Sequence, residues 1–410
     1  MIQVEKIIPG GFGLGTMEDG KKIFFWNALP GEIVEEYDTV KSKSHFIEAI
    51  ATKIKNPSPH RVSPPDACFL STSPWQIMNY NYELELKKSL IVEIFREHNL
   101  EIPTPEIFTD KKDYFYRNKM EYALYWDNGE QKIKLAFHTR GSHHKTPITK
   151  SSLERPEIFA AANRIVDELN SKHEEARKYQ SLLLRCNQKG EVSGGLYENG
   201  KPHPHFDNLT DTIMGHEYSY SPNGFFQINL PVYEMALSEI AKHIDTDNVL
   251  DLYAGVGTIG LSVARNRHLT LVECDKSAFT EMAKNCKTAP SEMIRSYDED
   301  ERADPVTTGV GDAHRGRSCL AVLAKSEEAL DYLASDQTVI LDPPRAGLDR
   351  KLTDKLLEVM PKKIIYLSCN PATQARDIAL LTNKYHITTI KTYNFFPHTP
   401  HIENLVVLSL

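Results

Sequence analysis

Apolar and polar residues alternate in short runs along the first part of the chain, and turn-forming residues separate these runs. The runs cover residues 2–8, 22–26, 33–41 and 47–54, with glycine- or proline-containing turns between them. An alternation with a period of two predicts strands, and closely spaced strands predict a small barrel over residues 1–57. The proline-rich residues 56–65 cannot continue a β-ladder and are predicted to form a linker.

A mixed pattern of helix and strand follows the linker. Residues 82–98 place leucine, isoleucine and valine among charged residues at helical spacing, which predicts a helix. Strand-like runs at 120–126, 133–137 and 180–186 then surround a helical pattern near 156–176. We therefore expect a central α+β domain at 58–220, whose helix at 82–98 packs on the domain that follows.

From about Val232 onward, apolar strands alternate with helical patterns. Alternation of this kind predicts a doubly wound α/β sheet, here assigned to residues 221–410. The acidic run within 296–304 is expected to be a solvated loop inserted between sheet strands. The predicted strands are 249–253, 269–273, 338–341, 363–367, 387–393 and 405–410.

The composition is that of a globular protein in a reducing compartment. A chain of 410 residues exceeds the roughly 250 to 300 at which a single core stops growing, so two or three domains are expected. Six cysteines are scattered without a Cys-x-x-Cys pair, and no apolar leader follows a basic start, so we expect a cytoplasmic protein with free thiols. No apolar run approaches the ~18 residues of a membrane span.

The net charge of −8 does not indicate a nucleic-acid binder, but the distribution of charge does. Residues 131–153 contain no Asp or Glu and hold five lysines and arginines with three histidines. Residues 53–61 and the aromatic-basic run 111–119 would also suit phosphate contacts and base stacking. Any one of these patches, taken alone, is also consistent with an ordinary solvated surface.

A glycine-rich turn follows the first strand of the predicted sheet. Residues Gly255–Gly260 match G-x-G-x-x-G, and Glu273 ends the next apolar strand, where a carboxylate can accept hydrogen bonds from a ribose. This pattern fits a dinucleotide as well as S-adenosylmethionine. Asp342-Pro343-Pro344-Arg345, at the end of a later strand, favours the methyl donor, because the prolines hold a carboxylate and backbone carbonyls rigidly towards a planar base.

Cys369 and Glu403 are the candidate nucleophile and base. Cys369 follows the strand at 363–367, at the carboxyl edge of the sheet, where ligands bind. A free cysteine is more often a small buried hydrophobe, but the other five lack such surroundings. Glu403 lies next to the final strand and is a candidate general base.

These motifs resemble those of the RNA uracil-C5 methyltransferases that act on transfer and ribosomal RNA. The barrel resembles the TRAM module, an OB-like RNA-binding fold, through residues 10–15, 19–20 and 28–32. The resemblance covers nearly the whole chain and implies a class I S-adenosylmethionine-dependent domain at 221–410. Its motifs are Phe225–Asn229, Asp251–Gly257, Asp342–Leu348, Tyr366–Pro371 with Arg376-Asp377, and Phe396–Glu403.

The resemblance also implies a role for each candidate residue. Cys369 would add to C6 of a uracil, Glu403 would remove the C5 proton, and Asp342 would lie between cofactor and base. The implied substrate is a structured RNA, 23S ribosomal RNA rather than transfer RNA, and the protein is expected to act as a monomer. The implied contacts to S-adenosylmethionine are Gln227, Tyr253, Thr258, Glu273, Asp312 and Asp342, and those to the substrate are Phe225, Pro343 and Arg345.

The sequence departs from the family pattern in the cysteines that would bind an iron–sulfur cluster. Many ribosomal-RNA members bind a [4Fe–4S] cluster through cysteines between barrel and central domain, and such a cluster normally needs four thiolates. Here only Cys68 stands in that region, and Cys186 alone cannot complete a site. We therefore expect neither an iron–sulfur cluster nor another metal.

Two other functions are compatible with the sequence. A methyltransferase acting on an amine of nucleic acid or protein would need no nucleophile, so it would not require Cys369. A non-catalytic RNA-binding protein with a degenerate fold would require neither Cys369 nor Glu403.

Overall fold

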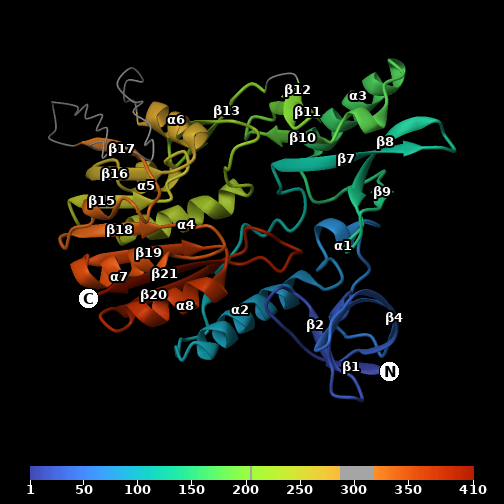
Figure 1. Ribbon diagram of the computed structural model, residues 1–410, viewed down its shortest axis with the longest axis horizontal. Coiled ribbons are helices and arrows are strands. Elements are labelled where there is room, and N and C mark those ends of the chain that lie inside the picture. The colour runs from blue at the N-terminus through green and yellow to red at the C-terminus, as the bar shows by residue number, and fades with distance from the viewer. Residues whose placement is uncertain (204–205, 287–317) are drawn as a thin grey trace. The chain divides into compact units, whose positions relative to one another are not determined.

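The computed structural model describes residues 1–203, 206–286 and 318–410 (Figure 1). By its contacts the chain forms two compact units. The first unit comprises residues 1–94, 111–207 and 396–401, and the second comprises 95–110, 208–395 and 402–410.

The first unit begins with a closed five-stranded barrel, which confirms the small barrel predicted at the N-terminus. Neighbouring strands are antiparallel except for β3 and β5, which are parallel. Alternate side chains such as Val4, Ile23 and Phe25 point inward and are buried, as the period of two requires. In the order β1-β2-β3-β5-β4, the barrel strands are β1 (Ile2–Ile7), β2 (Gly13–Thr16), β3 (Lys22–Trp26), β4 (Ile33–Ser42) and β5 (Phe46–Lys55).

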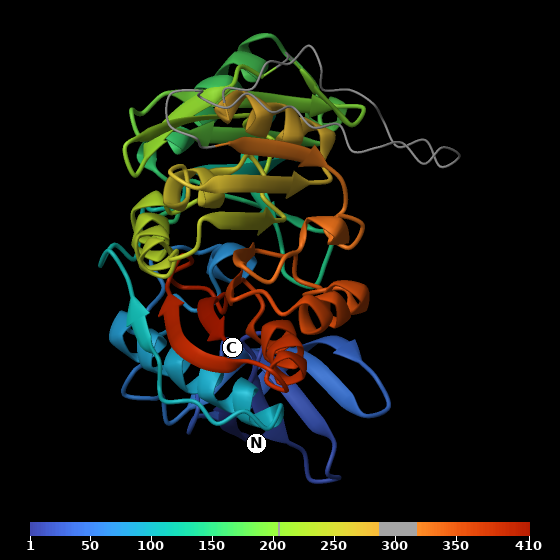
Figure 2. The same ribbon diagram turned by 90° about the vertical axis from the view of Figure 1, so that its left-hand side faces the viewer.

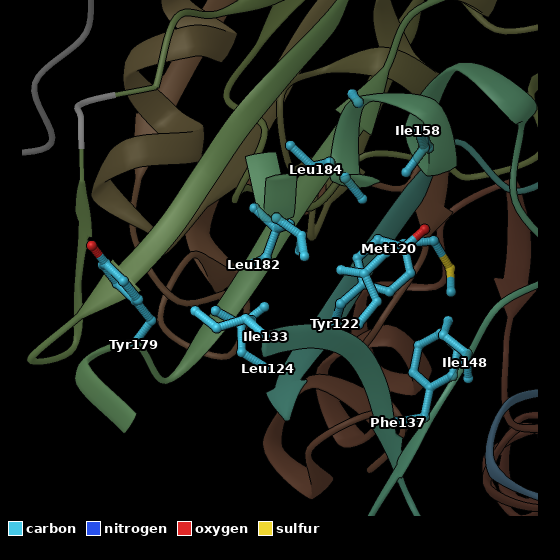
Figure 3. Close-up of a cluster of buried hydrophobic side chains, with 14 of the residues drawn as sticks. Met120, Tyr122, Leu124, Ile133, Phe137, Ile148, Ile158, Tyr179, Leu182 and Leu184 are labelled. Carbon is cyan, nitrogen blue, oxygen red and sulfur yellow. The ribbon is translucent and has the colours of Figure 1, made fainter. Parts of the chain in front are cut away.

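A six-stranded antiparallel sheet forms the rest of the first unit, with the order β12-β11-β10-β7-β8-β9. Helix α3 (Pro156–Ser171) packs on β8 and β10. Figure 3 shows side chains of the sheet and of Ile158 on α3 gathered into one apolar core. The strands are β7 (Lys119–Asp127), β8 (Lys132–His138), β9 (Lys145–Pro147), β10 (Ser181–Cys186), β11 (Val192–Glu198) and β12 (Lys201–His203), and the short helices are α1 (Phe69–Thr72) and η1 (Ala176–Lys178).

The second unit is built on an eight-stranded mixed sheet with the order β17-β16-β15-β18-β19-β21-β20-β6. The yellow and orange arrows of Figure 2 show β15, β16 and β17 side by side and pointing the same way. The strands are β6 (Glu106–Phe108), β15 (Asn248–Leu252), β16 (His268–Glu273), β17 (Cys319–Leu323), β18 (Gln337–Leu341), β19 (Lys363–Ser368), β20 (His386–Tyr393) and β21 (Glu403–Ser409).

Helices connect these strands, and this confirms the predicted doubly wound α/β fold. A two-stranded hairpin precedes the first of them. The hairpin strands are β13 (Leu209–Ile213) and β14 (His216–Tyr220), and the helices are α4 (Leu230–Lys242), α5 (Thr258–Val263), α6 (Lys276–Asn285), η3 (Leu330–Tyr332), α7 (Arg350–Val359) and α8 (Pro371–Leu381).

The strand order reverses between β15 and β18. The chain proceeds outward from β15 through β16 to β17, and then returns to place β18 on the other side of β15. In open α/β sheets, ligands bind outside the carboxyl ends of the strands at such a switch point. The candidate cofactor turn after β15 and Asp342 after β18 therefore lie at the position where the fold forms a binding crevice.

Three segments belong to a different unit from the one that their position in the sequence indicates. Residues 106–108 form the edge strand of the second unit's sheet, and 208–220 also lie in that unit, although the sequence analysis counted both with the central domain. Residues 396–401 lie in the first unit, between two strands of the second. Helix α2 (Tyr80–Glu97) contributes to both units.

None of the helices among the described residues is long and apolar enough to cross a membrane.

Candidate active site

The register of β19 against β21 brings Cys369 and Glu403 together. These strands are antiparallel, and their last ladder pair joins Ser368 to Asn404. Cys369 is the residue after Ser368 and Glu403 is the residue before Asn404, so the two lie next to each other across the strands. Glu403 is also held in register on its other side by pairing with Tyr393 of β20.

Asp342 joins the same edge from the neighbouring strand. In the parallel pair of β18 and β19, Leu341 lies opposite Tyr366. Asp342, the next residue, therefore lies beside the end of β19, close to the level of Cys369. The structure thus places the three predicted catalytic residues at one edge of one sheet.

Burial raises the pKa of all three groups, and neighbouring carboxyl groups add to the shift for Cys369 and Glu403. The pKa of Cys369 rises to about 11, because the thiol is largely buried and the carboxyl groups of Glu403 and Asp342 lie near it, with Arg345 opposing the shift. Burial raises the pKa of Glu403 well above its usual value, again with Asp342 adding to the effect. Burial alone raises the pKa of Asp342 to about 7. Like charges that share a buried site disfavour ionisation of one another.

Hydrogen bonds tie the loop after β18 to the loop that carries Cys369. Asn370 Nδ2 donates to the Arg345 carbonyl over 2.8 Å, and Thr373 Oγ1 donates to the same oxygen over 3.2 Å. The loop that bears Pro343 and Arg345 is therefore fixed relative to the thiol by direct contacts. The sequence pattern predicts no role for Asn370 or Thr373, although Asn370 stands within the cysteine motif.

A second set of contacts anchors that loop to α8. Asp377 Oδ2 accepts from Leu348 N and from the Tyr366 hydroxyl, while Arg376 donates to the Ala346 carbonyl. Gly347, with φ of +77°, has no room for a side chain, because a Cβ would lie 2.6 Å from Asp377 Oδ2. The Arg376-Asp377 pair, which the sequence showed only as part of a motif, thus acts as a scaffold for the Asp342 loop.

The glycine-rich turn after β15 has the backbone conformation that its glycines permit. Tyr253, Gly255 and Gly257 all have positive φ values, and at Gly257 a Cβ would also lie 2.9 Å from Leu261 Cδ1. Glu273, at the end of β16, accepts a 2.8 Å hydrogen bond from Gly255 N. An added Cβ at Gly255 would meet no described atom within 4 Å, so the turn leaves open space beside that carboxylate.

Asp251 stabilises this turn by accepting a hydrogen bond from its backbone. It is fully buried, and its Oδ2 accepts from Gly260 N over 2.8 Å. Its Oδ1 has no hydrogen-bond partner within the described part of the chain. Burial raises the pKa of this carboxyl to about 8, and the nearby Asp342 and Glu273 add to the shift. Open space, a carboxylate at the strand end and an unpartnered buried oxygen together fit a nucleoside-bearing cofactor.

The remaining predicted residues divide into buried and exposed ones. Gln227 and Thr258 are each 7% exposed, and Pro343 is buried, whereas Phe225 is 72% exposed on the segment before α4. An aromatic ring with that exposure is a suitable stacking surface for a base. Asp312 lies outside the described residues.

The two cysteines of the first unit lie in its apolar core. Cys68 and Cys186 both belong to the buried apolar cluster of that unit, and burial raises the pKa of Cys68 to about 11. Beside Cys68, Gln76 Nε2 donates to Asp66 Oδ2 and to Ser73 Oγ. Within residues 1–203, 206–286 and 318–410, no group of three or more His, Cys, Asp or Glu side chains is arranged to hold a metal ion.

Part of the basic segment at 131–153 is neutralised by neighbouring acids. Lys134 pairs with Asp127 over 2.7 Å, and Lys132 pairs with Glu130 over 2.6 Å. Arg140 instead stacks over the ring of Trp26 on the barrel, 4.1 Å from its centroid. The positive surface in this part of the first unit is therefore weaker than the sequence alone indicates.

The strand order and the glycine-rich turn at the switch point define a class I methyltransferase fold, and a thiol and a carboxyl lie next to each other at the carboxyl edge of its sheet. Residues 208–410 match the model of the family described as tRNA (Uracil-5-)-methyltransferase. Residues 208–410, which hold the candidate site, therefore belong to the RNA uracil-C5 methyltransferases, which are S-adenosylmethionine-dependent enzymes.

Individual relatives agree with this assignment. A Lactobacillus johnsonii protein named as an uncharacterized RNA methyltransferase is 28% identical over 95% of this chain and 94% of its own length. A protein of the same name from Aquifex aeolicus is 28% identical over 100% of this chain and 98% of its own length. The solved structure of the Pyrococcus abyssi tRNA (uracil-54, C5)-methyltransferase in complex with S-adenosyl-L-homocysteine is 23% identical, with a TM-score of 0.71 and full coverage of both chains, which shows the shared fold.

Proposed function

We propose that this protein methylates C5 of a specific uridine in structured RNA through a covalent bond between Cys369 and C6. The observation that carries the proposal is the pairing of Ser368 with Asn404, which sets the candidate nucleophile beside the candidate base. A methyltransferase acting on an amine has no use for this pair, because the amine is itself nucleophilic.

The chemistry explains why a thiol is needed. C5 of uracil is a poor nucleophile until a thiolate adds to C6 and creates an enolate whose charge reaches C5. C5 then takes the methyl group, and Glu403 removes the proton from C5. The electrons of that C–H bond re-form the C5–C6 double bond and expel the Cys369 thiolate. Transfer of the proton from Glu403 to this thiolate then returns both groups to their starting state.

The raised pKa values suit these roles. A buried carboxylate with a raised pKa is a stronger base than an exposed one, which favours removal of a carbon-bound proton by Glu403. The high pKa of Cys369 means that its proton must leave as the thiol attacks, or that a positive charge must first enter the site. The positive charge of Arg345 already lowers the pKa of both Cys369 and Glu403.

The proposed cofactor is S-adenosylmethionine, which supplies an electrophilic methyl group when bound. Glu273 would accept from the ribose hydroxyls, and Tyr253, Thr258 and Gln227 would line the pocket at the switch point. Asp342, at the end of β18, would face both cofactor and base. The open space beside Gly255 supports this assignment.

The target base must leave the RNA stack to reach Cys369, which costs about a few kcal/mol. Phe225 would stack on exposed bases, while Pro343 and Arg345 would border the uracil. The barrel supports structured RNA as the substrate. The resemblance ranks 23S ribosomal RNA above transfer RNA, whereas the family description and the name of the archaeal enzyme specify transfer RNA. Mapping 5-methyluridine in both RNA pools from cells that lack the protein decides between them.

Trapping the adduct tests the mechanism. Glu403→Gln should accumulate an RNA–protein species that migrates slowly on a denaturing gel, because the thiolate still adds but the C5 proton leaves slowly. Cys369→Ala should give neither this band nor methyl transfer, and the double variant should lack the band. Cys319→Ala is the matched control, since Cys319 is a partly exposed cysteine at the start of β17, at the sheet edge opposite to Cys369.

Each alternative gives a distinct result. Near-normal methylation by Cys369→Ala would overturn the nucleophile assignment and favour transfer to an amine. Absence of S-adenosylmethionine binding by calorimetry, in a folded protein that binds RNA, would favour a non-catalytic RNA-binding role.

A further inference from the structure

Two cysteines of the second unit lie in direct contact, far from each other in sequence. Cys286 is the capping residue that follows the last residue of α6, Cys319 begins β17, and the two are 33 positions apart in the chain. Their sulfur atoms are 2.7 Å apart, and both residues are partly accessible to solvent. Helix α6 packs along β17, so each cysteine adjoins or belongs to a regular, packed element.

The surroundings of the pair favour a reactive thiolate on Cys319. The two thiols share a hydrogen bond in which either sulfur can be the donor. Donation by Cys286 lowers the pKa of Cys319, and the Arg265 guanidinium acts in the same direction. The same contact, with burial, raises the pKa of Cys286. One thiol is therefore suited to attack and the other to serve as its proton-bearing partner.

The remaining cysteines have different surroundings. Cys68 and Cys186 lie in the apolar core of the first unit, and Cys369 is the proposed nucleophile. Cys274 is exposed, and burial and the neighbouring Glu273 raise its pKa. The close contact between two sulfurs thus distinguishes Cys286 and Cys319 from these four.

We propose that Cys286 and Cys319 form a reversible disulfide with a low-molecular-weight disulfide as the oxidant. The Cys319 thiolate attacks one sulfur of the oxidant, which forms a mixed disulfide and releases one thiol. Cys286, losing its proton, then attacks the Cys319 sulfur and releases the second thiol. Two protein thiols are oxidised to one disulfide, and one oxidant disulfide is reduced to two thiols.

The bond would tie the end of α6 to the first residue of β17. Asn285, next to Cys286, donates to the Val256 carbonyl in the glycine-rich turn over 2.9 Å, and its Oδ1 accepts from Ser219 N of β14. The disulfide would thus restrain a helix end that already contacts the cofactor turn. A cross-link between residues so far apart in sequence should raise thermal stability, because it constrains the unfolded chain.

The test uses the full-length reduced protein and oxidised glutathione under native conditions. We expect loss of two titratable thiols, a mass lower by two hydrogens, and a tryptic fragment that joins Cys286 to Cys319. Dithiothreitol should restore both thiols, and the oxidised protein should have the higher Tm. Cys274→Ser is the matched control and should form the same cross-link.

A second variant separates true pairing from general thiol oxidation. In Cys286→Ser, Cys319 should stop at a stable mixed disulfide with one glutathione, because no resolving thiol remains. The proposal is overturned if the wild-type protein carries glutathione separately on both cysteines, or if the cross-link involves Cys274. Neither result depends on RNA methylation, so the test stands apart from the proposed function.

Discussion

Glu83 and Lys87 form an ion pair of 2.8 Å on α2 in which neither side chain has any exposed area. Lys87 Nζ also donates to the Phe396 carbonyl over 3.1 Å and lies over the ring of Trp75. Glu83 Oε2 accepts from the backbone of His398 over 2.9 Å. This buried pair therefore holds the segment 396–401, which precedes Glu403 in the chain.

Lys87→Met should strongly destabilise the protein. The change leaves the Glu83 carboxyl buried without its cation, and breaking such a pair costs about 3–5 kcal/mol. Urea unfolding at neutral pH measures the effect. Lys88→Met is the matched control, because Lys88 pairs with the largely exposed Glu85 and such pairs contribute about 0–1 kcal/mol. An equal decrease in the free energy of unfolding in both variants would contradict the assigned role of Lys87.

The buried Asp251 should make the protein less stable as pH rises. Its folded pKa of about 8 lies above the unfolded value, so the folded state holds the extra proton. The stabilisation is complete below the unfolded pKa, near 4, and is lost as pH rises to about 8. Asp251→Asn should flatten this dependence while it keeps the acceptor for Gly260 N. The free energy of unfolding at pH 5 and at pH 8 measures this dependence, and Asp247→Asn, at an exposed carboxylate, is the control.

The reactivity of Cys369 should keep increasing well above neutral pH. With a pKa of about 11, its thiolate fraction rises about tenfold for each pH unit below that value. The rate of iodoacetamide alkylation, followed by mass spectrometry in a Cys274→Ser background, measures this. Arg345→Gln should move the profile to higher pH, because the guanidinium lowers the pKa. A plateau below pH 8 would show that the site activates the thiol without ligands.

The purified protein should carry no iron–sulfur cluster. Cys68 and Cys186 pack in an apolar core, and four thiolates are normally needed. Iron and sulfide analysis after anaerobic purification should find neither in stoichiometric amount. A brown protein with a broad absorbance near ~400 nm, as thiolate-ligated clusters show, would contradict this prediction.

Phe225→Ala should weaken RNA binding without loss of cofactor affinity. The ring is 72% exposed, and loss of a base-stacking aromatic typically costs about 1–3 kcal/mol. Filter binding with RNA and calorimetry with S-adenosylhomocysteine measure the two affinities. Trp126→Ala, which removes another exposed aromatic, at 40% exposure on β7, is the control and should have a smaller effect on RNA. An equal loss of affinity for RNA and for S-adenosylhomocysteine in Phe225→Ala would place the ring at the cofactor instead.

Much of the local structure follows from the sequence. The strand predicted at 249–253 is β15 at Asn248–Leu252, and the one at 363–367 is β19 at Lys363–Ser368. Helix 82–98 is α2 at Tyr80–Glu97. These elements are predictable because hydrophobic periodicity is a local property. The three-residue strand β6 was not predicted, since so short a run has no period of its own and forms only by pairing with β20.

The sequence by itself determined which residues could carry the chemistry, because Cys369, Glu403 and Asp342 each stand at the end of a predicted strand or next to one. Only the tertiary structure decided that they meet, since β21 lies antiparallel beside β19 and this register sets the first two side by side. It also decided the burial of Lys87 and the contact of Cys286 with Cys319. Strand order, register and contacts between distant residues depend on how complete elements pack, and local periodicity carries no information about that packing.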